Sequence, residues 1–311
     1  MFDRPLRIAT RQSRLALWQA EHVAARLRSL HPPLSVVLVP MTTQGDRVTD
    51  RPLAEIGGKG LFIKELELAL AEDRADIAVH SMKDVPTEMP PGMTIVAMLP
   101  REDARDALVS RRFATFDELP QGARVGTSSL RRQCQLKAAR PDLDMRMLRG
   151  NVETRLRKLE EGQYDAIVLA SAGLIRLGLE QRITQPLPFE LSLPAVGQGI
   201  VGVECRSDDE RNIDLVRGLN DADAWTCGTA ERAFAFKLQG SCQSPIAGFA
   251  QLRDRQLVLQ GVVGSPDGCR VYRGTNEGVA AHADAIGIAL AERLLAAGAD
   301  VLLAEQRALS P

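Results

Sequence analysis

Residues 6–30, LRIATRQSRLALWQAEHVAARLRSL, contain a short apolar run followed at once by an amphipathic segment. The run LRIAT (6–10) is typical of a buried strand, and the apolar residues after it recur at helical spacing to about Leu30. Ser13 stands where its side chain can cap the first turn of that helix. A strand that leads directly into a helix is the unit from which α/β proteins are built.

The same alternation continues over the first two-thirds of the chain. Further strands are expected at 34–41, 76–81, 93–100, 106–110, 166–171 and 200–206, and further helices at 60–74, 130–139 and 151–161. Such an alternation predicts parallel, doubly wound sheets with helices on both faces. The polar, aperiodic stretch LPREDARDA (99–107) places a boundary between two such units near residues 100–105.

From about residue 222 the pattern changes. The helical stretch DAWTCGTAERAFAFKLQ (223–239) precedes three strand-like runs joined by turns, and a long Ala-rich helix is expected at about 278–297. This order predicts a small α+β domain with an antiparallel sheet. Cys242, within GSCQSP (240–245), lies on the loop between the first helix and the first strand of that domain.

Composition and charge exclude several classes of function. The net charge of −1 indicates no general attraction to nucleic acid or to an anionic membrane, and no apolar run approaches the ~20 residues of a membrane span. The opening residues lack the pattern of a signal peptide, so we expect a cytoplasmic protein. The five cysteines and four histidines show no metal-ligand spacing, so we expect neither a disulfide framework nor a bound metal.

Arginine recurs at four predicted strand-to-helix junctions, IATRQSR (8–14), VGTSSLRR (125–132), LRGNVETR (148–155) and LASAGLIR (169–176). Ligands of parallel α/β sheets bind at the carboxyl ends of strands, where helix N-termini favour anions. A single such arginine is commonly a solvated helix residue, and codon usage alone can enrich arginine over lysine. Its presence at all four junctions favours a cleft for a ligand with several anionic groups, which the hydroxyls of Thr127, Ser128 and Ser129 can also contact.

The segment HSMKDVP (80–86) follows another predicted strand. Pro86 disfavours a helical conformation at Val85, so Lys83 and Asp84 are expected in a turn that points into the cleft. One interpretation is a surface Lys–Asp pair of little energetic value. The other is an aspartate among many cations, which stays ionised and can shuttle protons or stabilise a developing positive charge.

Two further stretches limit the chemistry. GGKG (57–60) lacks the first glycine and the final Ser or Thr of a phosphate-binding loop, so nucleotide binding is rejected, and the glycine-rich segment 42–60 is expected to act as a lid. Cys242 has no histidine nearby in the sequence, which weakens a nucleophilic role. It is either a loop cysteine without a role or a thiol that carries a group covalently.

Together these stretches resemble the porphobilinogen deaminases, also called hydroxymethylbilane synthases. The resemblance covers essentially the whole chain, and its motifs are IATRQSRLALWQA, TTQGDR, GGKGLFIKELE, HSMKDVPTEMP, VGTSSLRRQCQL, RGNVETRLRKL, LASAGLIRLG, LPAVGQGIVGVECR and GSCQSPIAG. Among them, HSMKDVP and VGTSSLRR are the most specific. Ser241 and Ser244 depart from the G-G-C-x-x-P pattern of many members, with consequences expected only for local loop packing.

The resemblance implies an enzyme with a dipyrromethane cofactor, joined by a thioether to Cys242. Four porphobilinogen molecules lose ammonia and condense head to tail onto this primer, and water then releases hydroxymethylbilane. It also implies a monomer with two domains like those of periplasmic binding proteins and a cleft between them. The implied division is 1–100 with 198–220, then 101–197, then a C-terminal domain at 221–311 that carries the cofactor cysteine.

The resemblance also implies a role for each site residue. Asp84 is the implied catalytic residue and faces the pyrrole nitrogens of the cofactor. Implied contacts to the cofactor come from Ser81, Lys83, Thr127, Ser128, Ser129, Arg131 and Arg132. Implied contacts to the substrate and the growing chain come from Arg11, Ser13, Lys59, Phe62, Arg149, Arg155, Arg176 and Gln198.

A competing hypothesis is a non-enzymatic, two-lobed binding protein for a polycarboxylate ligand. Such a protein shares the architecture and the arginine-lined cleft. It commonly carries a secretion signal, and it leaves Cys242 and the C-terminal domain without a purpose. A catalytically dead relative is also disfavoured, because Asp84, Cys242 and the junction arginines are all present.

Overall fold

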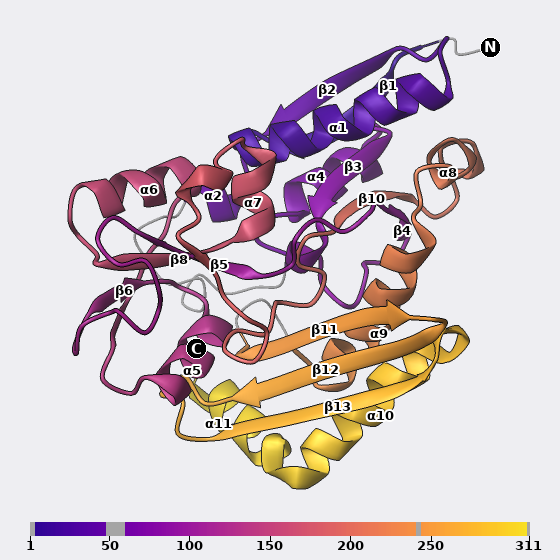
Figure 1. Ribbon diagram of the computed structural model, residues 1–311. Helices are drawn as coiled ribbons and strands as arrows, with labels where there is room; N and C mark the ends of the chain where they lie inside the picture. Colours follow the sequence, from indigo (N-terminus) through magenta and orange to yellow (C-terminus); the bar gives the residue numbers. More distant parts are fainter. Residues whose placement is uncertain (1–3, 48–59, 241–243, 310–311) are drawn as a thin grey trace.

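The computed structural model describes residues 4–47, 60–240 and 244–309, and the chain folds around three β-sheets (Figure 1). The first sheet has the strand order β2-β1-β3-β10-β4. Its strands are β1 (Leu6–Arg11), β2 (Val36–Met41), β3 (Ile77–Ser81), β4 (Met93–Met98) and β10 (Val201–Arg206). In the sequence, β10 comes after all the strands of the second sheet, so the first lobe is formed by two separate parts of the chain.

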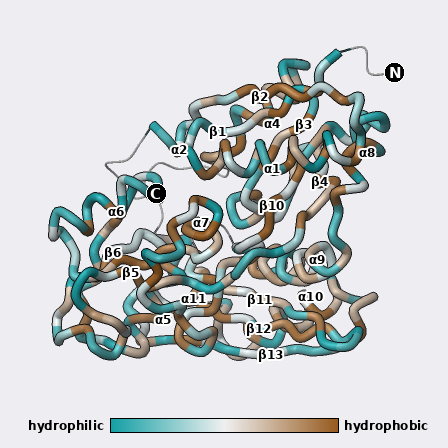
Figure 2. The backbone as a smooth tube through the Cα atoms, turned by 45° about the horizontal axis from the view of Figure 1, so that its top comes forward, coloured by the Kyte–Doolittle hydropathy of each residue, from teal (hydrophilic) through white to brown (hydrophobic). Residues whose placement is uncertain are grey.

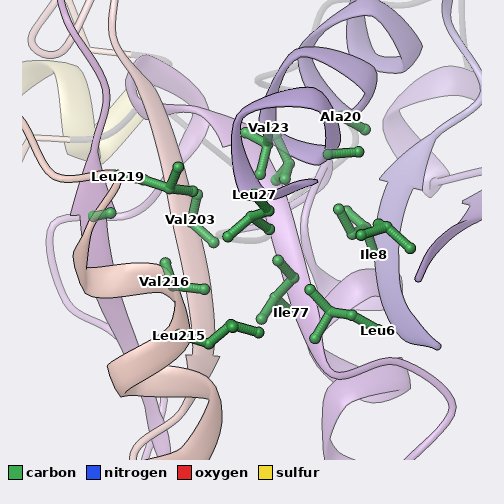
Figure 3. Packing of buried hydrophobic residues seen from close by; sticks show 14 of the residues in the cluster. Leu6, Ile8, Ala20, Val23, Leu27, Ile77, Val203, Leu215, Val216 and Leu219 are labelled. Carbon is green, nitrogen blue, oxygen red and sulfur yellow. The ribbon is translucent and has the colours of Figure 1, made fainter. Parts of the chain in front are cut away.

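Alternating residues of the central strands build two cores in the first lobe. Ile8 and Ile77 point to the face covered by α1 (Arg14–Leu30) and α8 (Glu210–Arg217), where they meet Leu27 of α1 and Leu215 of α8 (Figure 3). The residues next to them in the chain, Ala9 and Ala78, point to the opposite face, against α4 (Lys64–Ala71). The Ser13 hydroxyl accepts a hydrogen bond from the Ala16 N–H and caps α1, as predicted.

The second sheet has the order β7-β6-β8-β5-β9. Its strands are β5 (Asp106–Ser110), β6 (Arg124–Gly126), β7 (Asp144–Arg146), β8 (Ala166–Ala170) and β9 (Gln185–Pro186), and its helices are α5 (Leu130–Ala139), α6 (Val152–Glu160) and α7 (Ser171–Arg176). Leu136 of α5 packs against one face of this sheet, and Leu156 of α6 packs against the other. The second lobe therefore has helices on both faces, as the sequence predicts.

The expectation of wholly parallel sheets is wrong. In the first lobe β10 runs antiparallel to β3 and β4, and in the second lobe β5 runs antiparallel to β8 and β9. Both exceptions involve strands that adjoin a connection between the lobes. Their direction is set by the crossing of the chain from one lobe to the other, and the helical crossover that keeps neighbouring strands parallel is absent there.

The C-terminal domain is α+β, as predicted. Its antiparallel sheet contains β11 (Ile246–Arg253), β12 (Gln256–Gly264) and β13 (Val271–Val279), and its helices are α9 (Ala222–Lys237), α10 (Ala283–Leu294) and α11 (Asp300–Leu309). Phe234 of α9 is fully buried against the sheet. A Cβ atom at Gly261 would lie 2.6 Å from the Phe234 ring, so this strand position requires glycine.

Several expected boundaries differ. The helix expected at 60–74 begins at Lys64, the short helix α2 (Gln44–Arg47) lies inside the expected loop 42–60, and β13 runs to Val279. The final helix is interrupted at Gly298, whose φ of 110° is left-handed. Short turns of other helix types complete the chain: η1 (Met82–Asp84), η2 (Glu180–Arg182), η3 (Ala280–His282) and the π-helical η4 (Leu295–Ala299).

One buried carboxylate joins the two connections between the lobes to the C-terminal domain. Glu231 of α9 is fully buried and lies 2.7 Å from Arg101, in the first connection between the lobes. It also accepts hydrogen bonds from the N–H of Gly197, in the second connection, and of Ala250 in β11. Loss of this carboxylate would leave buried donors unpaired in both connections and in the C-terminal domain, so it holds the two connections against that domain.

Candidate functional site

Asp84 lies on η1, immediately after β3 of the first lobe. Val85 is extended, with φ −83° and ψ 125°, so the turn ends before Pro86 as predicted. Met82 is buried beneath the turn, whereas the Asp84 side chain is 27% exposed. The hydroxyl of Ser81 accepts a hydrogen bond of 2.8 Å from the Gln19 amide of α1. The end of β3 is thereby fixed, and the Asp84 carboxylate stays accessible.

Arg11, at the end of β1, connects Asp84 to the loop that follows β2. Its Nη1 atom lies 3.9 Å from Asp84 Oδ2, and its Nε donates a 3.0 Å hydrogen bond to Asp46 Oδ2 of α2. Its guanidinium lies over the Phe62 ring, 4.3 Å from the ring centroid. Burial opposes the charge, but Asp46 and Asp84 outweigh it and raise the pKa of Arg11. Arg11 thus lies beside both Phe62 and Asp84, and the contacts of these residues to a ligand stay a prediction.

A second aspartate, Asp106 at the start of β5, is the centre of a buried network. It is 0% exposed and accepts hydrogen bonds of 2.7 Å from Arg131 Nη1, Arg132 Nη2 and the Ser192 hydroxyl, and of 3.0 Å from the Gln198 amide. Burial opposes ionisation, but the two guanidinium groups hold the pKa of Asp106 well below its usual range. Two predicted cofactor arginines and one predicted substrate residue therefore share a carboxylate inside the second lobe.

Sequence reasoning missed Asp106. The sequence feature that could have identified it is a carboxylate at the first position of the apolar strand DALVS (106–110). A carboxylate buried there needs a cationic partner. The network leaves one donor unused, because Arg132 Nε is buried and has no hydrogen-bond partner.

The effects of neighbouring charges on pKa values show which cations lie together. The pKa of Lys83 is lowered to about 8, chiefly by burial and also by Arg132 and Arg131, against the opposing effect of Asp84 and Asp106. Burial likewise lowers the pKa of Arg155 to about 10, with contributions from Arg132, Arg149 and Arg11. In the part of the chain that the structure describes, these cations form a cationic cluster of six residues: Arg11, Lys83, Arg131, Arg132, Arg149 and Arg155.

Carboxylates also act on the cationic cluster. Among the described residues they include Asp46, Asp84 and Asp106. Burial and like charge lower the pKa values of Lys83, Arg149 and Arg155, so an anionic ligand would relieve an unfavourable arrangement. Together with the unused Arg132 Nε, this donor set fits a ligand that bears several carboxylates.

The predicted hydroxyl contacts already have partners within the protein. Ser129 caps α5 by accepting from the Arg132 N–H, and Thr127 accepts from the Ser129 N–H. Ser128 donates to the Leu148 carbonyl. These side chains shape the loop before α5, and their contacts to a ligand stay a prediction, as does that of Ser13.

Arg176, at the end of α7, has contacts that differ from those of the cationic cluster. Its Nη2 donates a 2.7 Å hydrogen bond to the Gly199 carbonyl, and its guanidinium lies over the Trp18 ring of α1. Two further predicted site residues, Lys59 and Cys242, lie outside the described residues. Within the described ranges no group of His, Cys, Asp and Glu side chains is placed to hold a metal ion, and no helix is long and apolar enough to cross a membrane.

Comparison with known families accounts for nearly the whole chain. Residues 6–214 match the family described as porphobilinogen deaminase, dipyromethane cofactor binding domain. Residues 225–296 match the family described as porphobilinogen deaminase, C-terminal domain. The first match ends within α8, and the second begins within α9.

Solved structures with a similar fold include periplasmic and lipoprotein binding domains. The VFT2 domain of Bordetella pertussis BvgS is 14% identical, with 68% of this chain and 84% of that chain covered and a TM-score of 0.42. A periplasmic substrate-binding protein of an ABC transporter from Coxiella burnetii is 15% identical, with 73% and 96% covered and a TM-score of 0.45. A methionine-binding lipoprotein from Bacillus subtilis is 10% identical, with 72% and 93% covered and a TM-score of 0.44. At such scores these likenesses carry no functional conclusion.

Proposed function

The chain belongs to the porphobilinogen deaminase family, and from this premise we propose that it catalyses the complete hydroxymethylbilane synthase reaction. The family is one of transferases in tetrapyrrole biosynthesis. In the proposed reaction four porphobilinogen molecules are joined head to tail, each losing ammonia, and water releases hydroxymethylbilane. The cationic cluster beside the accessible Asp84 carries the proposal, because each pyrrole ring brings two carboxylates.

The dipyrromethane cofactor, when bound, supplies a primer with a free pyrrole α-carbon and four carboxylates. We assign its attachment to Cys242. Arg131 and Arg132 are pre-oriented by Asp106, and the unused Arg132 Nε supports a carboxylate contact there. Lys83 and the hydroxyls of Ser81, Thr127, Ser128 and Ser129 complete the proposed set of cofactor contacts.

Asp84 is the proposed catalytic residue. Loss of ammonia from porphobilinogen leaves a positively charged pyrrole system, and a carboxylate at hydrogen-bonding distance from the pyrrole N–H stabilises that charge. The same carboxylate can accept and return protons during condensation. Arg11 lies 3.9 Å from Asp84 and leaves it partly exposed to an incoming ring.

The remaining proposed contacts bind substrate and the growing chain. Guanidinium groups suit this task because they meet carboxylates with two parallel hydrogen bonds. We assign this set to Arg11, Ser13, Lys59, Phe62, Arg149, Arg155, Arg176 and Gln198. We further propose the domain division 1–100 with 198–220, 101–197 and 221–311, and a monomeric, cytoplasmic enzyme.

The intact mass of the purified protein tests the proposal directly. We expect a mass that exceeds the sequence by one dipyrromethane, a shift that is lost in Cys242→Ala, and ammonia release on addition of porphobilinogen. A bare sequence mass without ammonia release would contradict the proposal. Binding of porphobilinogen without ammonia release would favour the non-enzymatic binding protein.

A further inference from the structure

Arg176 stands where the two connections between the lobes pass each other. Its Nη2 donates to the Gly199 carbonyl in the second connection at 2.7 Å. Glu102, in the first connection, acts electrostatically on the same guanidinium, although burial outweighs this effect and lowers the pKa of Arg176. The connections are in close contact, because a Cβ atom at Gly199 would lie 2.4 Å from the Glu102 carbonyl oxygen. Arg176 is therefore placed beside both connections between the lobes.

The first lobe reaches Arg176 through one face of α1. The guanidinium lies over the Trp18 ring, with 5.6 Å from Arg176 Cζ to the ring centroid. One turn further along α1, the His22 ring stacks on the same indole at 5.1 Å between centroids and 7° between planes. Leu15 approaches Gly173 of α7 on this side, and α7 is visibly more hydrophobic than the neighbouring α6 (Figure 2).

Trp18 has no part in the core of the first lobe. The apolar residues of α1 that fill this core are Ala20, Val23, Ala24 and Leu27, which lie on another face of the helix. Its indole is only partly buried and meets a cation of the other lobe. Tryptophan is the strongest aromatic partner for a guanidinium, and its rigid plane defines where that guanidinium can lie.

We propose that Trp18 is a positioning residue for Arg176, which holds the guanidinium of the second lobe in place from the first lobe, with His22 fixing the plane of the indole. The inference rests on the proposed function, in which Arg176 binds carboxylates of the substrate or growing chain. Burial lowers the pKa of His22, and Arg26 and Arg176 lower it further, so a neutral imidazole stacks beside the cation. A residue that orients a substrate-binding arginine acts on substrate binding more than on the chemical step.

Steady-state kinetics of a double-mutant cycle test the inference. We expect Trp18→Leu to raise KM for porphobilinogen about three- to tenfold, the range of a cation–π contact, with kcat changed less than about twofold. Trp18→Phe keeps an aromatic face and should recover most of the loss. In an Arg176→Gln background, Trp18→Leu should have no further effect, because its partner is already absent.

A spectroscopic titration needs neither substrate nor activity. In Trp225→Phe, Trp18 is the single tryptophan of the chain, and protonation of the stacked His22 should quench its fluorescence. Arg176→Gln removes a neighbouring positive charge, so the midpoint of this quenching should move to higher pH. Arg26→Gln, on α1 itself, should move it in the same direction, and Arg217→Gln on α8 is the control that should not.

Two results would overturn the inference. One is a cycle in which the effects of Trp18→Leu and Arg176→Gln on KM multiply as independent changes. The other is a quenching midpoint that Arg176→Gln leaves unchanged. If the proposed function itself is wrong, no variant releases ammonia, and the titration still decides whether Arg176 lies on Trp18. The titration also remains decisive where Trp18→Leu does not fold, because the titrated protein keeps Trp18.

Discussion

Two aspartates, one in each lobe, have opposite surroundings. Asp106 is fully buried and receives hydrogen bonds from two arginines, a serine and a glutamine. Asp84 is 27% exposed and lies 3.9 Å from Arg11, which also pairs with Asp46. A carboxylate whose hydrogen-bonding positions are all occupied orients its neighbours but cannot take up a further proton or cation. A loosely paired carboxylate can exchange protons or stabilise a positive charge during the reaction.

The largest effect should come from Asp84→Asn. The substitution keeps the shape and removes the charge, so substrate binding should persist while kcat falls by about 10²- to 10⁴-fold. Ammonia release under saturating porphobilinogen measures the loss. Asp84→Glu, which keeps the charge on a longer side chain, is the matched control and should lose less. Near-normal turnover of Asp84→Asn would remove the distinction between the two aspartates.

Asp106→Ala should instead affect stability. It leaves Arg131 and Arg132 buried without their carboxylate, so the free energy of unfolding should fall by about 3–5 kcal/mol. Urea unfolding measures this change. Asp142→Ala, which breaks a partly exposed pair with Arg140, is the control and should cost much less. Equal losses in the two variants would show that the buried network is not special.

Lys83 is acted on by both aspartates and should show a smaller, pH-dependent effect. Its pKa in the folded protein is about 8, below the usual value of 10.5, chiefly because of burial. The unfolded chain binds more protons than the folded protein between these values, so stability should rise as pH increases from about 8 to 10.5. The slope should approach ~1.4 kcal/mol per pH unit for this one group.

Urea unfolding of Cys242→Ala across this pH range measures the contribution of Lys83 without the cofactor. Lys83→Met should flatten the rise, while Lys137→Met, which removes an exposed ammonium that donates to the Pro141 carbonyl, should leave it intact. Because Asp84 is the stronger of the two aspartates that favour the charged lysine, Asp84→Asn should extend the rise to lower pH. An unchanged profile in Lys83→Met would assign the effect to other groups.

Much of the fold follows from local patterns. The strand at 6–11, its capped helix and α5 at 130–139 appear where spacing and capping residues place them. The helix α8 was missed, because its many charged residues hide the apolar positions Leu215 and Val216 that pack on the core. The direction of β10 was also missed, since strand direction depends on how the chain crosses between lobes and leaves no mark in the strand itself.

The sequence by itself determined the order of elements, the family and the set of cations, because periodicity, capping and charge belong to the residues and their near neighbours. Only the tertiary structure decided what each arginine meets. Arg131 pairs with Asp106, 25 positions away, and Arg176 lies on Trp18 of the other lobe. The availability of a guanidinium depends on burial and on partners brought from distant segments, and these exist only once the chain has folded.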